Sequence, residues 1–275
     1  MHGYRRLTSR DNPLLKRVRA LAHQARERRR EGRTLLDGAH LLTAALDARW
    51  PLEHVLVSEA VQHHPEIQHL LARFPAEVDV ASIPSSLFKP LSPVDTPSGI
   101  VAVIAPPEAP AAVSFTHDLL VLEGIQDPGN LGSILRTAAA AGVRDVLLTP
   151  GCARAWSPRC LRAGMGGHFM LAIHEEVDAL SALRDFPGAV LATRLAPDSV
   201  PLYELACLAR ADAPVAWLFG GEGAGLSATL SQRADVGVRI PMPGAVESLN
   251  VGAAVAICLF EGVRQRSAGA SKRQS

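Results

Sequence analysis

Aromatic residues make up only 4% of the 275-residue chain and charged residues 20%, while 48% of the residues are hydrophobic. No apolar run reaches the roughly 18–20 residues that a membrane-spanning helix needs, and residues 1–20 hold no apolar signal-peptide core. No two of the four cysteines are spaced as Cys-x-x-Cys, which argues against a zinc site or a disulfide framework. We therefore expect a globular cytoplasmic protein with no membrane contact and no metal, built from one large domain or two modest ones.

The charge is unevenly distributed along the chain. The net charge is +1, but residues 1–35, here called the basic arm, hold eleven Lys and Arg residues against three Asp and Glu residues. A basic segment on a mildly acidic body favours a polyanionic partner. Residues 12–30 have helical spacing, so the alternative is a solvated, charged helix. The candidate polyanion contacts are Arg10, Lys16, Arg17, Arg28, Arg29 and Arg30.

The order of apolar and polar segments predicts two domains. Residues 1–105 alternate short strands and helices, which indicates a small α/β domain. Residues 106–117 are rich in proline and alanine and form the expected linker. Residues 118–265 follow as the larger domain, and residues 266–275 as a flexible tail.

The larger domain reads as continuous apolar strands that alternate with helices. The strands include "DLLVLEGI", "DVLLTP", "APVAWLFG" and "DVGVRIPM". Such strands are typical of a mostly parallel sheet with helices on both faces. Ligands of such sheets bind at the loops beyond the carboxyl ends of the strands. Three of these loops are unusual.

The first loop lies in "LEGIQDPGNLGSILRTAAAAGV", where a tight turn precedes a helix. We expect Asn130 to cap this helix. Arg136 lies in its second turn among small and aliphatic residues, where burying a guanidinium without an anionic partner is costly. Its forked donors suit a phosphate. The alternative is a salt bridge between Arg136 and a carboxylate on a neighbouring element.

The second loop, "LFGGEGAGLS", has four glycines around a single charged residue, Glu222. Glycines such as Gly220 and Gly221 let the backbone approach a ligand closely. The glycine spacing differs from the dinucleotide-binding fingerprint, and the loop follows a late strand. The alternative is a glycine-rich turn without a ligand.

The third loop lies in "RIPMPGAVESLNVGAAVAICLFEG". Pro241 and Pro243 stiffen the exit from a strand, and Ser248 and Asn250 lie where the next helix starts. Main-chain groups that are unpaired at such a turn can grip the polar edge of a flat heterocycle. The alternative is a simple helix N-cap, for which Ser248 would suffice without Asn250.

The three loops together resemble the SpoU (TrmH-type) family of RNA ribose 2′-O-methyltransferases in the SPOUT superfamily. The resemblance covers residues 118–262. The matching positions are Asn130, Gly132 and Arg136 in the first motif, Gly220, Glu222 and Gly223 in the second, and Ile240, Pro241, Met242, Ser248, Leu249, Asn250 and Val251 in the third. The small domain resembles the substrate-binding domain of the family, which is akin to a ribosomal-protein RNA-binding fold. Its first strand ends in Asp37-Gly38 where the family often has Glu-Gly.

The resemblance implies S-adenosylmethionine as the cofactor, bound within a deep trefoil knot that general topology rules would not predict. It implies that Gly220, Ile240 and Leu249 hold the cofactor through main-chain atoms, with Gly221 and Met242 beside them. Arg136 would act at the target ribose, and Asn130, Glu222, Ser248 and Asn250 would shape the pocket. The basic arm would then bind RNA.

By the same resemblance we expect a homodimer that methylates a ribose 2′-hydroxyl, most simply in 23S (large-subunit) rRNA and otherwise in tRNA. A non-catalytic RNA-binding module of the same fold is the main rival. A nucleotide-dependent oxidoreductase on a parallel sheet is a weaker one, because the dinucleotide fingerprint is missing.

Overall fold

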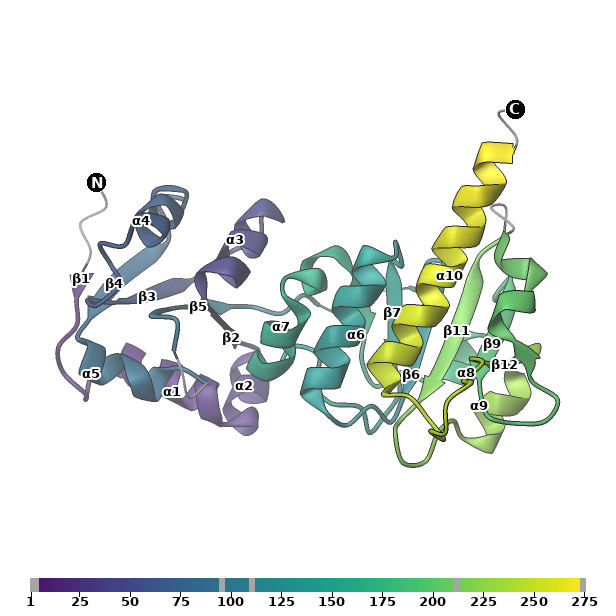
Figure 1. Cartoon of the computed structure of the whole chain (residues 1–275). Coiled ribbons are helices and arrows are strands. Elements are labelled where there is room, and N and C mark those ends of the chain that lie inside the picture. The colour runs from purple at the N-terminus through teal and green to yellow at the C-terminus, as the bar shows by residue number, and fades with distance from the viewer. Residues whose placement is uncertain (1–4, 94–96, 109–111, 210–212, 273–275) are drawn as a thin grey trace. The chain divides into compact units, whose positions relative to one another are not determined.

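The computed structural model describes residues 5–93, 97–108, 112–209 and 213–272 (Figure 1). The chain forms two compact units. Unit 1 comprises residues 1–108 and 156–169, and unit 2 comprises residues 109–155 and 170–275. No helix within the described ranges combines the length and the apolar character that crossing a membrane requires. Among the same residues, His, Cys, Asp and Glu side chains nowhere gather in a group of three that could hold a metal ion.

Unit 1 is built on a mixed sheet, five-stranded in the part of the chain that the structure describes, with the order β1-β4-β3-β5-β2. Strand β5 runs antiparallel to its neighbours β3 and β2, while β1, β4 and β3 are parallel. The strands are β1 (Arg5–Arg6), β2 (Thr34–Asp37), β3 (His54–Ser58), β4 (Asp79–Ile83) and β5 (Ile100–Ile104). The helices are α1 (Pro13–His23), α2 (Ala25–Glu31), α3 (Ala39–Asp47), α4 (Pro65–Ala72), α5 (Ser85–Phe88) and the 3-10 turn η1 (Lys89–Leu91).

Helix α1 forms where the basic arm carries an apolar stripe. The side chain of Asn12 accepts a hydrogen bond from the main-chain N–H of Leu14 at 2.9 Å, and Pro13 occupies the first helical turn. Both features favour a helix start. Leu15, Val18 and Leu21 are buried in the core of unit 1, so the arginines of α1 lie on its other faces.

Residues 156–169 belong to unit 1, although the sequence interpretation counted them with the domain at 118–265. They form α7 (Pro158–Gly164) and the start of the 3-10 turn η2 (Gly167–Met170). The hydroxyl of Thr34 in β2 donates to the carbonyl oxygen of Trp156 at 2.7 Å. The Trp156 ring stacks on Trp50 with 5.5 Å between the ring centroids.

Unit 2 has a wholly parallel sheet, seven-stranded over the described residues, with the order β10-β12-β9-β11-β6-β7-β8. The strands are β6 (Leu119–Glu123), β7 (Asp145–Leu148), β8 (Ala172–His174), β9 (Ala189–Thr193), β10 (Val200–Pro201), β11 (Val215–Gly220) and β12 (Val236–Arg239). The helices are α6 (Pro128–Ala140), α8 (Ala179–Ala182), α9 (Ala228–Arg233) and α10 (Val251–Lys272), with the 3-10 turns η3 (Leu202–Glu204) and η4 (Ala206–Ala209).

Both faces of this sheet are covered, which is why its central strands are apolar throughout. Leu119, Val121 and Leu218 pack with α8 and α9 in one core cluster. Helices α6 and α10 pack against each other and lie side by side in Figure 1. The prediction of a mostly parallel α/β sheet is confirmed.

We expect Leu218→Ala to lower the free energy of unfolding of unit 2 by about 2–5 kcal/mol, because it empties a fully buried position in the middle of β11. Urea denaturation combined with hydrogen exchange of unit 2 peptides would measure the change. Leu195→Ala is the control, since the Leu195 side chain is 68% exposed and its loss should change stability by less than about 0.5 kcal/mol. Equal losses in the two variants would contradict this account of the core.

Candidate functional site

The three unusual loops follow β6, β11 and β12, and they meet at one edge of the unit 2 sheet. Strands β6 and β11 are direct neighbours, and β12 is separated from β11 only by β9. Because all of these strands are parallel, their carboxyl ends lie at the same edge. Segments that are about a hundred residues apart in sequence are thereby brought together.

Three polar side chains, one from each loop, form a closed triangle of hydrogen bonds. The amide of Asn130 donates to Oε1 of Glu222 at 2.7 Å. The amide of Asn250 donates to the same oxygen at 2.8 Å and to Oδ1 of Asn130 at 3.1 Å. The structure therefore brings together three of the five residues that the sequence places around the reacting groups.

The helix caps differ from the expected ones. Asp127, not Asn130, caps α6, because its side chain accepts from the main-chain N–H of Asn130 at 2.8 Å. The Asn130 side chain is therefore left to bond Glu222. At the third loop, Oδ1 of Asn250 accepts from the N–H of Gly252 at 2.9 Å and of Ala253 at 3.3 Å. The alternative of a simple N-cap, for which Ser248 would suffice, is not observed, because Asn250 both caps α10 and joins the triangle.

A cavity of about 360 Å³, here called the first cavity, lies beside the triangle between the ends of β9, β11 and β12. Its lining contains all of the residues that the sequence assigns to the cofactor, together with three of the pocket-shaping residues: Gly220, Gly221, Ile240, Met242, Leu249, Glu222, Ser248 and Asn250. Sequence reasoning missed Thr193, Arg194 and Leu195, which also line it. Their position at the carboxyl end of an apolar strand was the available signal.

The walls of the first cavity suit a partly apolar, partly polar ligand. Phe219, Val238 and Leu249 give it apolar surface, and Leu249 is 36% exposed. Residues 241–249 make no main-chain hydrogen bond to any other described residue. Three of them line the cavity, Met242, Ser248 and Leu249, and their main-chain groups are available to a ligand. Residues 243–249 are exposed, so a ligand in the first cavity would take the place of water at these groups.

Close backbone contacts explain the glycine at the end of β11. A Cβ atom on Gly220 would come within 2.0–2.2 Å of the main chain of Gly225 and Leu226. The second loop thus folds back on its own strand, and the N–H of Gly225 donates to the carbonyl oxygen of Gly221 at 2.9 Å. Any larger residue at position 220 would push the loop away from the first cavity.

Arg136 does not join the triangle within this chain. It lies on the exposed face of α6 and lines neither the first cavity nor the cavity beside it. The premise that Arg136 is buried is therefore wrong. Its guanidinium makes no hydrogen bond or ion pair with any residue in the described ranges, so the alternative of an internal salt bridge is not observed there.

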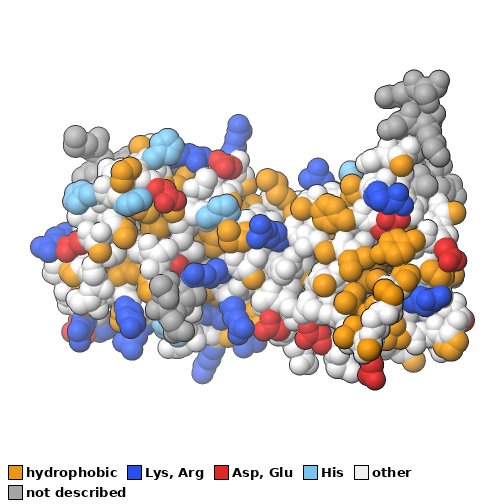
Figure 2. All heavy atoms as spheres, in the orientation of Figure 1, with side chains coloured by type: hydrophobic (Ala, Val, Ile, Leu, Met, Phe, Trp, Pro, Cys, Tyr) orange, Lys and Arg blue, Asp and Glu red, His pale blue; other side chains and the backbone are white. Residues whose placement is uncertain are grey.

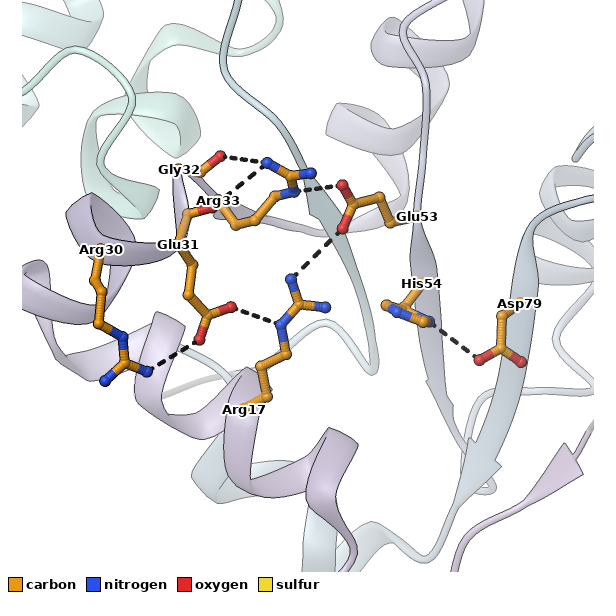
Figure 3. A network of polar contacts seen from close by, with 8 residues as sticks. All are labelled: Arg17, Arg30, Glu31, Gly32, Arg33, Glu53, His54 and Asp79. Carbon is orange, nitrogen blue, oxygen red and sulfur yellow. Dashed lines mark hydrogen bonds and ion pairs between the residues drawn. The ribbon is translucent and has the colours of Figure 1, made fainter.

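The cations of the basic arm fall into two groups. Several hold unit 1 together (Figure 3): Arg17 pairs with Glu31 at 2.6 Å and with Glu53 at 3.6 Å, and Arg33 also pairs with Glu53. Arg28 donates to the carbonyl oxygen of Leu21 at 2.7 Å, and its burial lowers the pKa of the guanidinium. Arg17 and Arg28 are thus tied up by the protein, contrary to the expectation that they face a polyanion.

Other cations of the arm point outward. Lys16 pairs with Asp11 at 2.8 Å, and Arg30 pairs with Glu27 at 2.5 Å, both at the surface. Four exposed arginines have no hydrogen bond or ion pair with the described residues: Arg10, Arg19, Arg26 and Arg29. The sequence analysis had named only Arg10 and Arg29 among its candidate contacts. Figure 2 shows Lys and Arg side chains gathered over the region of α1 and α2.

Comparison with known proteins points in one direction. Residues 118–260 match the model of the SpoU rRNA methylase family, and residues 12–102 match that of an MRM3-like substrate binding domain. An uncharacterized tRNA/rRNA methyltransferase of Synechocystis is 34% identical over 96% of each chain. The 23S rRNA (guanosine(2553)-2′-O)-methyltransferase RlmP of Bacillus subtilis is 29% identical over 86% of this chain and 91% of its own. A crystal structure of an AdoMet-bound rRNA methyltransferase from Sinorhizobium meliloti superimposes with a TM-score of 0.80 at 28% identity, covering 95% of this chain and 98% of the other.

We expect Asn250→Ala to destabilise unit 2 by about 1 kcal/mol, because it removes the cap of α10 together with one corner of the triangle. Asn250→Ser should recover most of this loss, since serine also caps helices. Chemical denaturation would measure both variants. Ser248→Ala serves as the comparison and should change little, because no hydrogen bond of the Ser248 side chain to the described residues is found. A larger effect of Ser248→Ala than of Asn250→Ala would refute the assignment of the cap.

Proposed function

The chain belongs to the SpoU rRNA methylase family and is an S-adenosylmethionine-dependent RNA 2′-O-methyltransferase, and from this premise we propose that it methylates a ribose of 23S rRNA with the cofactor in the first cavity. The observation that carries this proposal is the first cavity, where apolar walls meet a stretch of unpaired main chain beside the Asn130–Glu222–Asn250 triangle. Transfer RNA is the second candidate substrate. The cytoplasmic location remains a prediction from the composition.

The residues of the first cavity fit S-adenosylmethionine. Its heterocycle has a flat face for Leu249 and Phe219 and a polar edge for main-chain groups. We assign the main chain of Gly220, Ile240 and Leu249 to hold the adenine and ribose, with Gly221 and Met242 beside them. When bound, the cofactor would supply a methyl group on a positively charged sulfur, and Glu222 is the carboxylate that lines the same cavity.

Glu222 is the group that we assign to the target hydroxyl. Its Oε1 accepts two amide hydrogen bonds, while no described residue donates to Oε2. Oε2 can therefore accept a hydrogen bond from the ribose 2′-hydroxyl, orient its oxygen, and receive its proton when that oxygen is methylated. Asn130 and Asn250 fix the carboxylate in place, so little reorganisation is needed at the moment of reaction. Ser248 lines the cavity on the same side.

Arg136 completes the proposed site at the RNA. An arginine side chain remains protonated in proteins, so we favour orientation of the ribose and stabilisation of charge over removal of the hydroxyl proton. An RNA phosphate would give this exposed guanidinium the partner that it lacks among the described residues.

We also propose a homodimer and a trefoil knot, as the family resemblance implies. Phe260 of α10 is 46% exposed and Val246 63%, and Figure 2 shows hydrophobic side chains gathered over the region of α10. A second copy covering this surface would bury it and lie close to the exposed face of α6 that carries Arg136. The knot is supported by the position of β12 between β9 and β10, which precede it in the chain.

Transfer of tritium from labelled S-adenosylmethionine tests the proposed function. Unmodified 23S rRNA transcript should accept the label, and tRNA should accept less. Mapping of 2′-O-methyl groups in RNA from cells with and without the gene would identify the nucleotide. Cofactor binding without transfer to any unmodified RNA would instead indicate a non-catalytic RNA-binding module.

Arg136→Ala should reduce methyl transfer by at least about a hundredfold, a typical loss on removal of a charge-stabilising donor. The affinity for S-adenosylmethionine, measured by calorimetry, should remain nearly unchanged because Arg136 does not line the first cavity. Arg144→Ala is the matched control, an exposed arginine at the opposite edge of the sheet, before β7. Loss of cofactor binding in Arg136→Ala would show that its assignment to the RNA is wrong.

RNA binding should depend on the unpaired arginines of the arm more than on the paired ones. We expect the triple change Arg19→Ala, Arg26→Ala and Arg29→Ala to weaken RNA binding. The slope of log affinity against log salt concentration should fall in magnitude by up to about 2, because each phosphate contact with a single strand contributes roughly 0.7. The control of equal charge is Arg5→Ala, Arg6→Ala and Arg73→Ala, whose guanidinium groups pair with Asp79, Glu59 and Asp47. Fluorescence anisotropy with labelled rRNA fragments at several KCl concentrations would compare them. Equal slopes would argue against a role of the unpaired group.

A further inference from the structure

A second cavity, of about 580 Å³, lies on the other side of the triangle from the first. It is enclosed by the loop from β6 to α6 and by the glycine-rich loop after β11. Gly221, Glu222 and Val251 line both cavities and form a shared wall. A group held in the second cavity is therefore next to Glu222, as is the ligand of the first.

The side chains around the second cavity include carboxylates but no Lys or Arg. Glu123, Asp127 and Glu222 contribute acceptor oxygens, and Gln126 an amide. Oε2 of Glu123 accepts from the main-chain N–H of Ser227 at 2.6 Å, and no described residue donates to its Oε1. A lining that has carboxylates and lacks cations repels a phosphate. It suits a neutral group with N–H donors.

The walls of the second cavity are shaped for a flat ligand. Gly124, Gly221, Gly223 and Gly225 all line it, so peptide planes rather than side chains form much of its surface. The two loops touch where a Cβ atom on Gly221 would lie 2.4 Å from the carbonyl oxygen of Gly124. The volume falls within the range of pockets that hold molecules of nucleoside size.

From these observations we propose that the second cavity receives the nucleoside that is methylated, turned out of the RNA, with Glu123 accepting hydrogen bonds from a guanine base. Guanine presents neighbouring N–H donors on its Watson–Crick edge, which the free oxygen of Glu123 can accept. The ribose of that nucleoside then lies against the shared wall, where its 2′-hydroxyl meets Oε2 of Glu222. Turning one base out of a stack breaks its stacking and pairing, and the contacts in the cavity offset this loss. The inference rests on the proposed function.

The first test fills the cavity. Ala224 lines the second cavity and not the first. Ala224→Leu should therefore lower the rate of methyl transfer to 23S rRNA transcript at least tenfold, while the affinity for S-adenosylmethionine stays within twofold of the wild-type value. Gly223→Leu should act alike, because a Cβ atom there meets nothing within 4 Å and the backbone has no positive φ. Gln232→Leu is the control, at an exposed position in the last turn of α9 that lines neither cavity, and it should transfer at the wild-type rate.

The second test concerns the base. Glu123→Gln keeps one oxygen for the N–H of Ser227 but replaces the other acceptor by a donor, so transfer to the mapped guanosine should fall about tenfold or more. With inosine at that position, which lacks the 2-amino donor, wild-type transfer should fall as well, and the Glu123→Gln loss should become smaller.

The outcomes separate the two ideas. If the wild-type enzyme methylates no RNA, the proposed function fails. If it methylates RNA but Ala224→Leu and Gly223→Leu are as active as Gln232→Leu, or lose cofactor binding in parallel with transfer, the second cavity is not the nucleoside site. A mapped target other than guanosine would overturn the assignment of Glu123.

Discussion

One carboxylate, that of Glu222, joins the three loops at the edge of the larger sheet. Oε1 of Glu222 accepts hydrogen bonds from Asn130 at the start of α6 and from Asn250 at the start of α10. These bonds tie the three loops to one another, and Glu222 forms part of the wall that the two cavities share. Hydrogen bonds to a charged acceptor are about twice as strong as neutral ones, so two such bonds hold the loops together more strongly than two neutral bonds would.

The tie can form only because the main chain approaches itself closely on both sides of it. Gly220 lies against the backbone of Gly225 and Leu226, and Gly221 against that of Gly124. Side chains at either position would separate the loops and widen both cavities. The glycines therefore serve the geometry of the site as much as contact with a ligand, which is why their spacing differs from that of a dinucleotide-binding loop.

The parallel sheet and the edge where its three unusual loops meet could be predicted, because strand periodicity and loop position are local properties of a sequence. The grouping of Gly220, Met242 and Leu249 followed from the family resemblance, and the structure places all three in the lining of one cavity. The cap at Asp127 was missed because two neighbouring residues compete for it, and only tertiary contact draws Asn130 away to Glu222. The arginines of the arm were harder. Whether Arg17 is free depends on Glu53, which lies thirty-six residues further on and directly before β3. The spacing of residues in the sequence does not show that these two side chains meet.

Residues 156–169 leave the larger sheet between β7 and β8 and are stacked into the core around Trp50 in the smaller unit. The polypeptide thus passes from one unit to the other three times instead of once. No single cut releases either unit intact: a fragment that starts at the linker carries α7 without the β2 and Trp50 surfaces that bury it. Exchange of unit 1 for another domain would therefore need two separate replacements in the sequence, at residues 1–108 and at residues 156–169.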